Sequence, residues 1–122
     1  MKVSPTLLIV EDNDDLRFLY KRFLNGFSII EAENGAEGVQ KYIQTNPKPL
    51  LVLMDIEMPI LDGVAASIEI FKLDPDARII ALTAFSRVRK EEIVNAGVRT
   101  VLSKPINLKK LQEIVVEKIN NS

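Results

Sequence analysis

The sequence predicts an α/β fold in which a five-stranded parallel sheet is covered by helices on both faces. Short, continuous apolar runs recur along the chain, and such runs are typical of strands buried on both faces. A half-exposed strand would instead show alternating apolar and polar residues. Segments with apolar residues at helical spacing separate these runs, so that five strands alternate with five helices. Right-handed crossovers between parallel strands then place helices on both faces of the sheet.

The first strand and the first helix are expected before Gly26. Thr6–Val10 is a continuous apolar run and predicts the strand. Asn13 or Asp14 can cap the helix that follows, and Asn25-Gly26 ends it. The apolar positions expected to face the sheet are Leu16, Leu19, Tyr20, Phe23 and Leu24. Phe18 lies off this face and is expected to be exposed.

The second strand and helix are shorter. Ser28–Ala32 predicts the strand, and Asn34-Gly35 begins a helix. Ala36, Val39 and Ile43 are expected to form the inward face of this helix. Asn46-Pro47 ends it, because proline lacks a backbone N–H and disfavours helical geometry in the residue before it.

The third strand is the most apolar run that stops on an acid. It covers Leu50–Asp55, with Asp55 at its carboxyl end. A helix is expected from about Gly63 to Leu73, where Asp74-Pro75-Asp76 stops it. The residues expected to face inward are Val64, Ile68 and Phe71.

The last part of the chain predicts two strands and two helices. The strands are Arg78–Thr83 and Thr100–Ser103. A polar helix between them covers about 88–95, and Ala96-Gly97 is its expected end because glycine favours that position. Asn107 can cap the final helix. Its residues expected to face the sheet are Leu108, Leu111, Val115 and Ile119.

Composition excludes several classes of function. The 122 residues, 47% of them hydrophobic, fit one globular domain. Sixteen basic residues balance seventeen acidic ones, so direct nucleic-acid binding is not expected. No apolar run is long enough for membrane insertion. The chain has neither cysteine nor histidine, which excludes disulfides, thiolate and imidazole metal sites and Ser-His hydrolysis. Carboxylates, hydroxyls and lysines must therefore carry the chemistry.

Polar residues stand where four of the predicted strands end. They are Glu11, Asp12, Asp55, Thr83 and Lys104. Because the carboxyl ends of parallel strands lie at one edge of a sheet, these side chains are expected to converge there. Three neighbouring carboxylates repel one another, which raises their pKa values unless a cation shares the site. Mg²⁺ suits such a site, since it prefers oxygen ligands and keeps several waters.

This set of groups suits the transfer of a phosphoryl group to a carboxylate. A carboxylate can act as a nucleophile and take a phosphoryl group as an acyl phosphate. The incoming negative charge requires positive charge, which Mg²⁺ and Lys104 can provide from two sides. The hydroxyl of Thr83 and the backbone N–H of Ala84 can donate hydrogen bonds to the phosphoryl oxygens.

Four motifs, in this order and spacing, resemble the receiver domain of two-component response regulators. They are Glu11-Asp12, Asp55-x-x-Met58-Pro59-x-x-Asp62-Gly63, Thr83-Ala84 and Lys104-Pro105. The resemblance covers the whole chain and implies a single receiver domain, residues 1–122. It also implies a flavodoxin-like, doubly wound sheet with strand order 2-1-3-4-5.

The resemblance implies a role for each acidic residue of the site. Asp55 resembles the residue that accepts the phosphoryl group, and it would also bind Mg²⁺. Glu11, Asp12 and the backbone carbonyl of Glu57 resemble the other Mg²⁺ ligands. Magnesium is therefore the expected cofactor.

The remaining motifs correspond to the rest of the receiver site, with one departure. Thr83 and Lys104 resemble the hydroxyl and the lysine of the family, and the Lys104-Pro105 bond is expected to be cis. Val101 stands where the family usually has an aromatic residue that turns inward on phosphorylation. A β-branched side chain with restricted χ1 cannot make the same movement, so this part of the switch is in question.

The implied function is that of a stand-alone signalling switch. The chain would take a phosphoryl group from the phosphohistidine of a sensor histidine kinase or a phosphotransfer protein, and phosphorylation would change the surface that an unknown downstream protein binds. Such a phosphoprotein catalyses only its own phosphorylation and dephosphorylation and is not an enzyme acting on a metabolite. It is expected to be cytoplasmic and a monomer or a weak dimer.

Three alternatives share parts of this pattern. A phosphorelay intermediate would pass the phosphoryl group on to the histidine of another protein. A small aspartyl-phosphate hydrolase would use an Asp-x-Asp motif, which Asp55-Ile56-Glu57 does not match. A pseudo-receiver would lack the chemistry, although the site residues are intact. The basic residues Arg87, Arg89 and Lys90 suggest either a solvated helix face or a partner surface.

Overall fold

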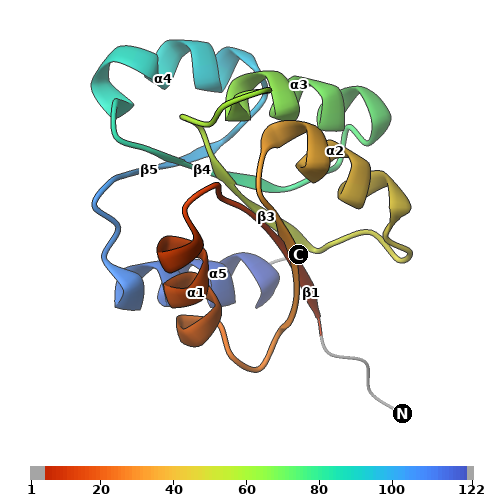
Figure 1. Ribbon diagram of the computed structural model, residues 1–122, viewed down its shortest axis with the longest axis vertical. Coiled ribbons are helices and arrows are strands. Elements are labelled where there is room, and N and C mark those ends of the chain that lie inside the picture. Colours follow the sequence, from red (N-terminus) through yellow and green to blue (C-terminus); the bar gives the residue numbers. More distant parts are fainter. Residues whose placement is uncertain (1–4, 121–122) are drawn as a thin grey trace.

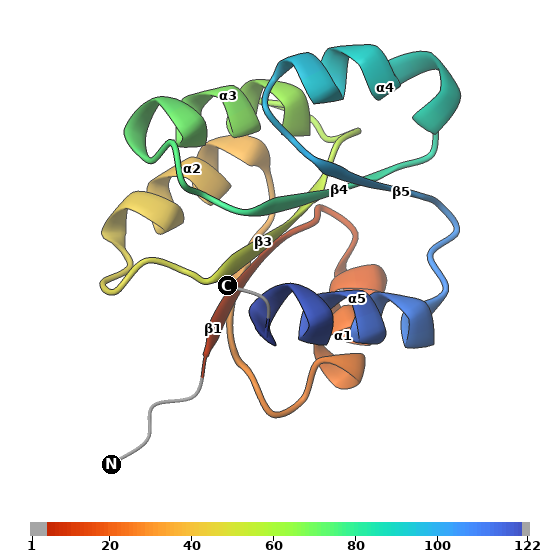
Figure 2. The ribbon, with the colours of Figure 1, turned by 180° about the vertical axis from the view of Figure 1, so that it is seen from behind.

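The computed structural model describes residues 5–120, which form five strands and five helices in strict alternation. All strand pairs are parallel and the strand order is β2-β1-β3-β4-β5 (Figure 1). Helices α1 and α5 cover one face of the sheet, and α2, α3 and α4 cover the other (Figures 1 and 2). The predicted fold class and strand order are confirmed. No helix among the described residues is long and apolar enough to cross a bilayer.

The strands lie within one residue of their predicted bounds. They are β1 Thr6–Val10, β2 Ser28–Ala32, β3 Leu51–Asp55, β4 Ile79–Thr83 and β5 Thr100–Ser103. Every residue of β3 and β4 is buried, as expected for central strands covered on both faces. In the register of the sheet, Asp55 is paired with Leu82, and Thr83 is paired with Ser103. The carboxyl ends of the strands are therefore level with one another.

Side-chain caps set the start of four helices. The helices are α1 Asp14–Phe23, α2 Gly35–Gln44, α3 Gly63–Leu73, α4 Ser86–Asn95 and α5 Leu108–Asn120. Asn13, Asn34 and Asp62 each accept a hydrogen bond from a backbone N–H in the first turn of α1, α2 and α3. Asn107 caps α5, as predicted, because its Oδ1 accepts from the backbone N–H of Lys110 at 2.9 Å. Phe85 precedes α4 and makes no such bond, which explains why the sequence placed the start of α4 too late, at about residue 88.

The inward face of α2 differs from the prediction. Val39 packs against the core as predicted, but Ala36 and Ile43 are exposed. Gly35, Gly38 and Tyr42 are buried instead. A Cβ atom on Gly38 would lie 2.9 Å from Cγ2 of Val10, so α2 approaches β1 through a position without a side chain. The periodicity of apolar side chains could not reveal this contact, because the contact depends on their absence.

Two other predicted inward faces are partly wrong. In α1, Leu19 and Phe23 are exposed. The residues that pack against the sheet are spaced four apart, at Leu16, Tyr20 and Leu24. In α3, Ile68 is exposed and Ala66, Ser67 and Ile70 are buried instead, while Val64 and Phe71 pack at the margin of the core. Phe18 is exposed and the inward face of α5 is as predicted.

Candidate functional site

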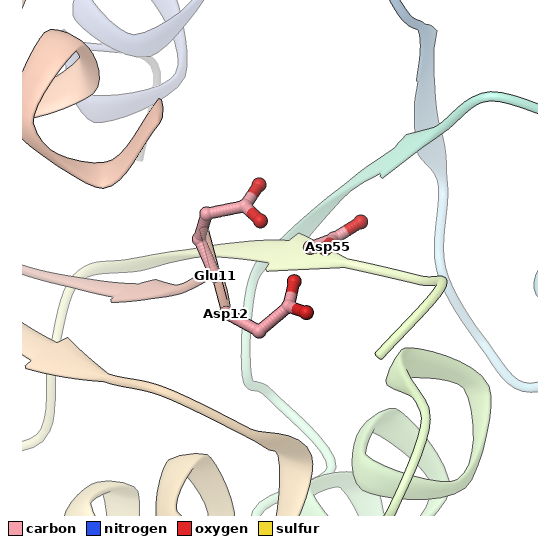
Figure 3. A group of neighbouring side chains, drawn as sticks. All are labelled: Glu11, Asp12 and Asp55. Carbon is pink, nitrogen blue, oxygen red and sulfur yellow. The ribbon is translucent and has the colours of Figure 1, made fainter. Parts of the chain in front are cut away.

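The three predicted acidic residues meet where β1 and β3 end. Glu11 and Asp12 follow β1, and Asp55 is the last residue of β3. One carboxylate oxygen of each lies within 4.8 Å of one from each of the other two, and Figure 3 shows the three side chains together. The side chains of Glu11 and Asp55 are only 1% exposed, whereas Asp12 is exposed to solvent. The expected convergence of these carboxylates is present.

Lys104 is the cation within hydrogen-bonding distance of this cluster. Its Nζ donates to Asp55 Oδ1 at 2.8 Å and to Glu11 Oε1 at 3.4 Å. The backbone N–H of Lys104 also donates to the carbonyl of Thr83 at 2.8 Å, which holds the loop after β5 beside the end of β4. The Lys104–Pro105 peptide bond is cis, as the resemblance implied.

Burial and charge repulsion shift the pKa values of these groups. Burial, followed by the charge of Asp55, raises the pKa of Glu11 from its usual 4.5 to about 7. Burial also raises the pKa of Asp55, against the hydrogen bond from Lys104. Burial alone would lower the pKa of Lys104, but its hydrogen bond to Asp55, together with the negative charges of Asp55 and Glu11, outweighs burial, and the pKa is raised. Two buried carboxylates thus share one ammonium group, so the cluster carries less positive than negative charge.

The donor set fits a hard divalent cation. Glu11, Asp12 and Asp55 offer only carboxylate oxygens, which are the ligands that Mg²⁺ prefers, and the open side at Asp12 leaves room for waters. The side chain of Glu57, in contrast, is not part of this cluster. Its backbone carbonyl, assigned to the metal by resemblance, stays a prediction.

Thr83 and Ala84 direct their donors at Glu57. The hydroxyl of Thr83 donates to Glu57 Oε2 at 2.6 Å, and the backbone N–H of Ala84 donates to Glu57 Oε1 at 3.0 Å. Thr83 also accepts a hydrogen bond from the backbone N–H of Phe85 at 3.0 Å, so the loop after β4 is well ordered around this hydroxyl. The donors expected to bind a phosphoryl group are therefore occupied by a carboxylate of the same chain.

Arg89 is the residue that the sequence did not single out as part of the site. From the first turn of α4, its Nη1 lies 3.3 Å from Glu57 Oε2 and its Nη2 lies 2.9 Å from Asp62 Oδ2. Its Nε donates to Glu92 at 2.8 Å within the same helix. One interpretation of this segment was a solvated helix face. That interpretation is wrong for Arg89, whose side chain is 22% exposed and contacts three acidic residues. Its position in the first turn of α4, shortly after the Thr83-Ala84 motif, was the available signal in the sequence.

Val101 lies on β5 and is half-buried. It packs against the core between the sheet and helices α2, α3 and α4. The position that usually carries a mobile aromatic residue is thus filled by a small β-branched side chain held in the core margin.

Comparison with known proteins gives one consistent result. A model of the response regulator receiver domain family matches residues 7–116. The chemotaxis protein CheY of Bacillus subtilis is 37% identical over 122 residues, which cover 97% of this chain and all of that protein.

Solved structures agree with this result. The response regulator protein TrrA from Thermotoga maritima, in complex with Mg²⁺ and beryllofluoride, is 36% identical with a TM-score of 0.83, and the match covers 93% of this chain and 98% of that one. CheY in the CheX-CheY-BeF3-Mg²⁺ complex from Borrelia burgdorferi is 29% identical with a TM-score of 0.85, covering 93% and 87%. Both resemble this chain along nearly its full described length.

Proposed function

This chain belongs to the response regulator receiver domain family, and from that premise we propose that Asp55 is its phospho-acceptor. A receiver of the CheY type is a phospho-accepting signalling switch rather than a classical enzyme. We propose one receiver domain over residues 1–122, of which 1–4 and 121–122 lie outside the described residues. The observation that carries the proposal is the buried Asp55 carboxylate, held at 2.8 Å by Lys104 at the edge of the sheet.

The proposed reaction moves a phosphoryl group from nitrogen to oxygen. A carboxylate oxygen of Asp55 attacks the phosphorus of a partner's phosphohistidine, the P–N bond breaks, and the imidazole nitrogen keeps the bonding electron pair and takes up a proton. The proposed partner is a sensor histidine kinase or a phosphotransfer protein. The proposed location of the chain is the cytoplasm. Lys104 keeps Asp55 in position and offsets part of the charge that arrives with the phosphoryl group.

Magnesium is the proposed cofactor. Glu11, Asp12 and Asp55 would hold the ion, with the backbone carbonyl of Glu57 as a further ligand. When bound, Mg²⁺ supplies positive charge that offsets the repulsion between the carboxylates and the phosphoryl oxygens. The structures of TrrA and of the CheX-CheY complex both contain Mg²⁺ together with beryllofluoride, which supports this assignment.

The switch is proposed to act through the segment after β4. Thr83 and Ala84 would donate to the phosphoryl oxygens, and their movement would change the surface formed by α4 and β5, which a downstream protein binds. The packed position of Val101 supports a route through α4 rather than through residue 101.

Intact mass tests the proposed acceptor. The protein is incubated with a small-molecule phosphodonor such as phosphoramidate, with and without Mg²⁺, alongside Asp55→Asn. We expect a single phosphoryl adduct that requires Mg²⁺ in the original protein and no adduct in the variant, because the amide cannot act as the nucleophile. An adduct that persists in Asp55→Asn would place the acceptor elsewhere. The absence of an adduct in both proteins, with Mg²⁺ binding demonstrated, would favour a pseudo-receiver.

A further inference from the structure

The carboxylate of Glu57 occupies a small anion site at the ends of β3 and β4. Its two oxygens accept from two consecutive residues: the hydroxyl of Thr83 at 2.6 Å and the backbone N–H of Ala84 at 3.0 Å. Both donors end the strand next to β3, and the register places Leu82 beside Asp55. A pair of donors that receives one carboxylate in this way can receive two oxygens of another anion at the same edge of the sheet.

The same two donors are those that a phosphoryl group on Asp55 would use. One hydroxyl proton and one amide proton cannot serve the Glu57 carboxylate and a phosphoryl group at full strength together. The two anions would also repel each other at close range. Glu57 therefore has to leave Thr83 and Ala84 before the phosphoryl group can bind them.

Arg89 holds Glu57 in this position from outside the sheet. Its guanidinium contacts Glu57 through Nη1 at 3.3 Å and Asp62 through Nη2 at 2.9 Å. Asp62 is itself fixed, because it caps α3 through the backbone N–H of Ala65. The carboxylate of Glu57 thus connects the end of β4 to the first turn of α4.

We propose that Glu57 is an internal competitor of the phosphoryl group, and that Arg89 is the positioning residue that keeps it on Thr83 and Ala84 in the unphosphorylated protein. This inference rests on the proposed function of Asp55. Phosphorylation displaces the Glu57 carboxylate, and the contact of Arg89 with Glu57 is lost at the same time. The change in the site is thereby passed to α4 without a moving side chain at residue 101.

The rate of adduct formation tests the competition directly. With phosphoramidate as donor and Mg²⁺ at a saturating concentration, we expect Glu57→Ala to form the Asp55 adduct roughly tenfold faster than the original protein. Tenfold corresponds to about 1.4 kcal/mol, close to the lower end of what a hydrogen bond to a charged group contributes. Glu92→Gln is the matched control. Glu92 also pairs with Arg89, but makes no contact with Thr83 or Ala84 among the described residues, so its rate should stay within about twofold.

A second measurement follows the donors themselves. The ¹⁵N–¹H resonance of Ala84 in the unphosphorylated protein should move in Glu57→Ala and stay in place in Glu92→Gln, because only Glu57 accepts from that amide. Arg89→Ala should move the same resonance part of the way and accelerate adduct formation about threefold, a partial loss of the same charged hydrogen bonds. A role of Arg89 in stability alone would leave the Ala84 resonance unchanged.

The outcomes separate this inference from the proposed function. Adduct formation in the original protein and in Glu57→Ala at equal rates would overturn the competition and leave Asp55 as the acceptor. Equal acceleration in Glu57→Ala and Glu92→Gln would also overturn it, since a general loss of negative charge would then explain the rate. No adduct in either protein would overturn the proposed function, and the inference with it.

Discussion

Two clusters of charged residues in this protein differ in the number of cations that contact each carboxylate and in the burial of that carboxylate. At the site, the carboxylates of Glu11 and Asp55 are both buried and share Lys104. On β2, Glu31 is 37% exposed and contacts two cations, with Arg17 Nε and Lys21 Nζ each 2.9 Å from one of its oxygens. Arg17 also pairs with Asp14 and Glu33. We call the first the site cluster and the second the Glu31 cluster.

The pKa values of the two clusters shift in opposite directions. The hydrogen bond from Lys21, reinforced by Arg17, lowers the pKa of Glu31 in spite of some burial. Burial and Asp55 raise the pKa of Glu11 to about 7. The Glu31 cluster therefore stabilises the fold at neutral pH, whereas the site cluster destabilises it. Buried charged groups that destabilise the fold unless a cation binds are typical of functional sites.

Removing the lysine of each cluster should give the largest contrast. Lys104→Met leaves two carboxylates buried without a cation, so we expect the free energy of unfolding at pH 8, without metal, to fall by about 4 kcal/mol. Lys21→Met removes a cation that is 41% exposed, and Arg17 still pairs with Glu31, so the loss should stay below about 1 kcal/mol. Denaturant unfolding of both variants measures this. Equal losses would contradict the distinction between the clusters.

The pH dependence of stability should reveal the site cluster next. The folded protein holds the Glu11 proton up to about pH 7 and the unfolded chain only to about 4.5, so the folded state binds more protons between these values. Without metal, the free energy of unfolding should therefore fall by up to about 3 kcal/mol as pH rises through this window. The chain has no histidine to add a slope there. In Glu11→Gln most of the fall should disappear, and a flat curve for the original protein would refute the prediction.

Magnesium should reverse part of this loss. At a free concentration roughly thirty times its dissociation constant, Mg²⁺ should raise the free energy of unfolding at pH 8 by about 2 kcal/mol, because only the folded state assembles the three carboxylates. Thermal unfolding with and without the ion measures the gain. Asp12→Asn should lose most of it and Glu31→Gln should keep it. A gain that is the same in both variants would mean that the ion binds elsewhere.

The Glu31 cluster should give the smallest effect and the opposite sign with pH. Glu31→Gln should cost less than about 1 kcal/mol at pH 7, as expected for half-exposed ion pairs. Because the pKa of Glu31 is lowered, its stabilisation is present above the unfolded value of 4.5 and is lost as pH falls through the lower folded value. The difference between Glu31→Gln and the original protein should therefore shrink as the pH falls below 4.5. Unfolding curves at pH 7 and at a series of more acidic pH values test this, and a difference that grows in acid would be contrary evidence.

Sequence alone was sufficient for the fold and for the convergence of the acids. Continuous apolar runs located the strands, and the parallel topology brought Glu11 and Asp55 to one edge of the sheet although they lie far apart in the sequence. The inward face of α2 was missed because Gly38 packs through a missing side chain. The spacing of apolar residues predicts where apolar side chains are buried, but it does not predict a close contact made by the helix backbone.

Sequence could not reveal what Glu57 does. Its place two residues after Asp55 indicated proximity to the site, but the direction of its side chain depends on the donors at the end of a neighbouring strand. Arg89 was missed for a related reason. Two of its three acidic partners come from the loop between β3 and α3, far from Arg89 in the sequence, and only the folded chain brings them to α4.

Carboxyl ¹³C NMR of Glu11 as a function of pH, with and without Mg²⁺, tests most directly whether the site cluster is short of positive charge. Without the ion, Glu11 should titrate near pH 7, while Glu31 in the same spectra titrates below its usual range. Saturating Mg²⁺ should move the Glu11 titration down by at least two pH units or so, since the cation favours the ionised carboxylate. A Glu11 titration near 4.5 that does not respond to Mg²⁺ would contradict both the charge deficit and the proposed metal site.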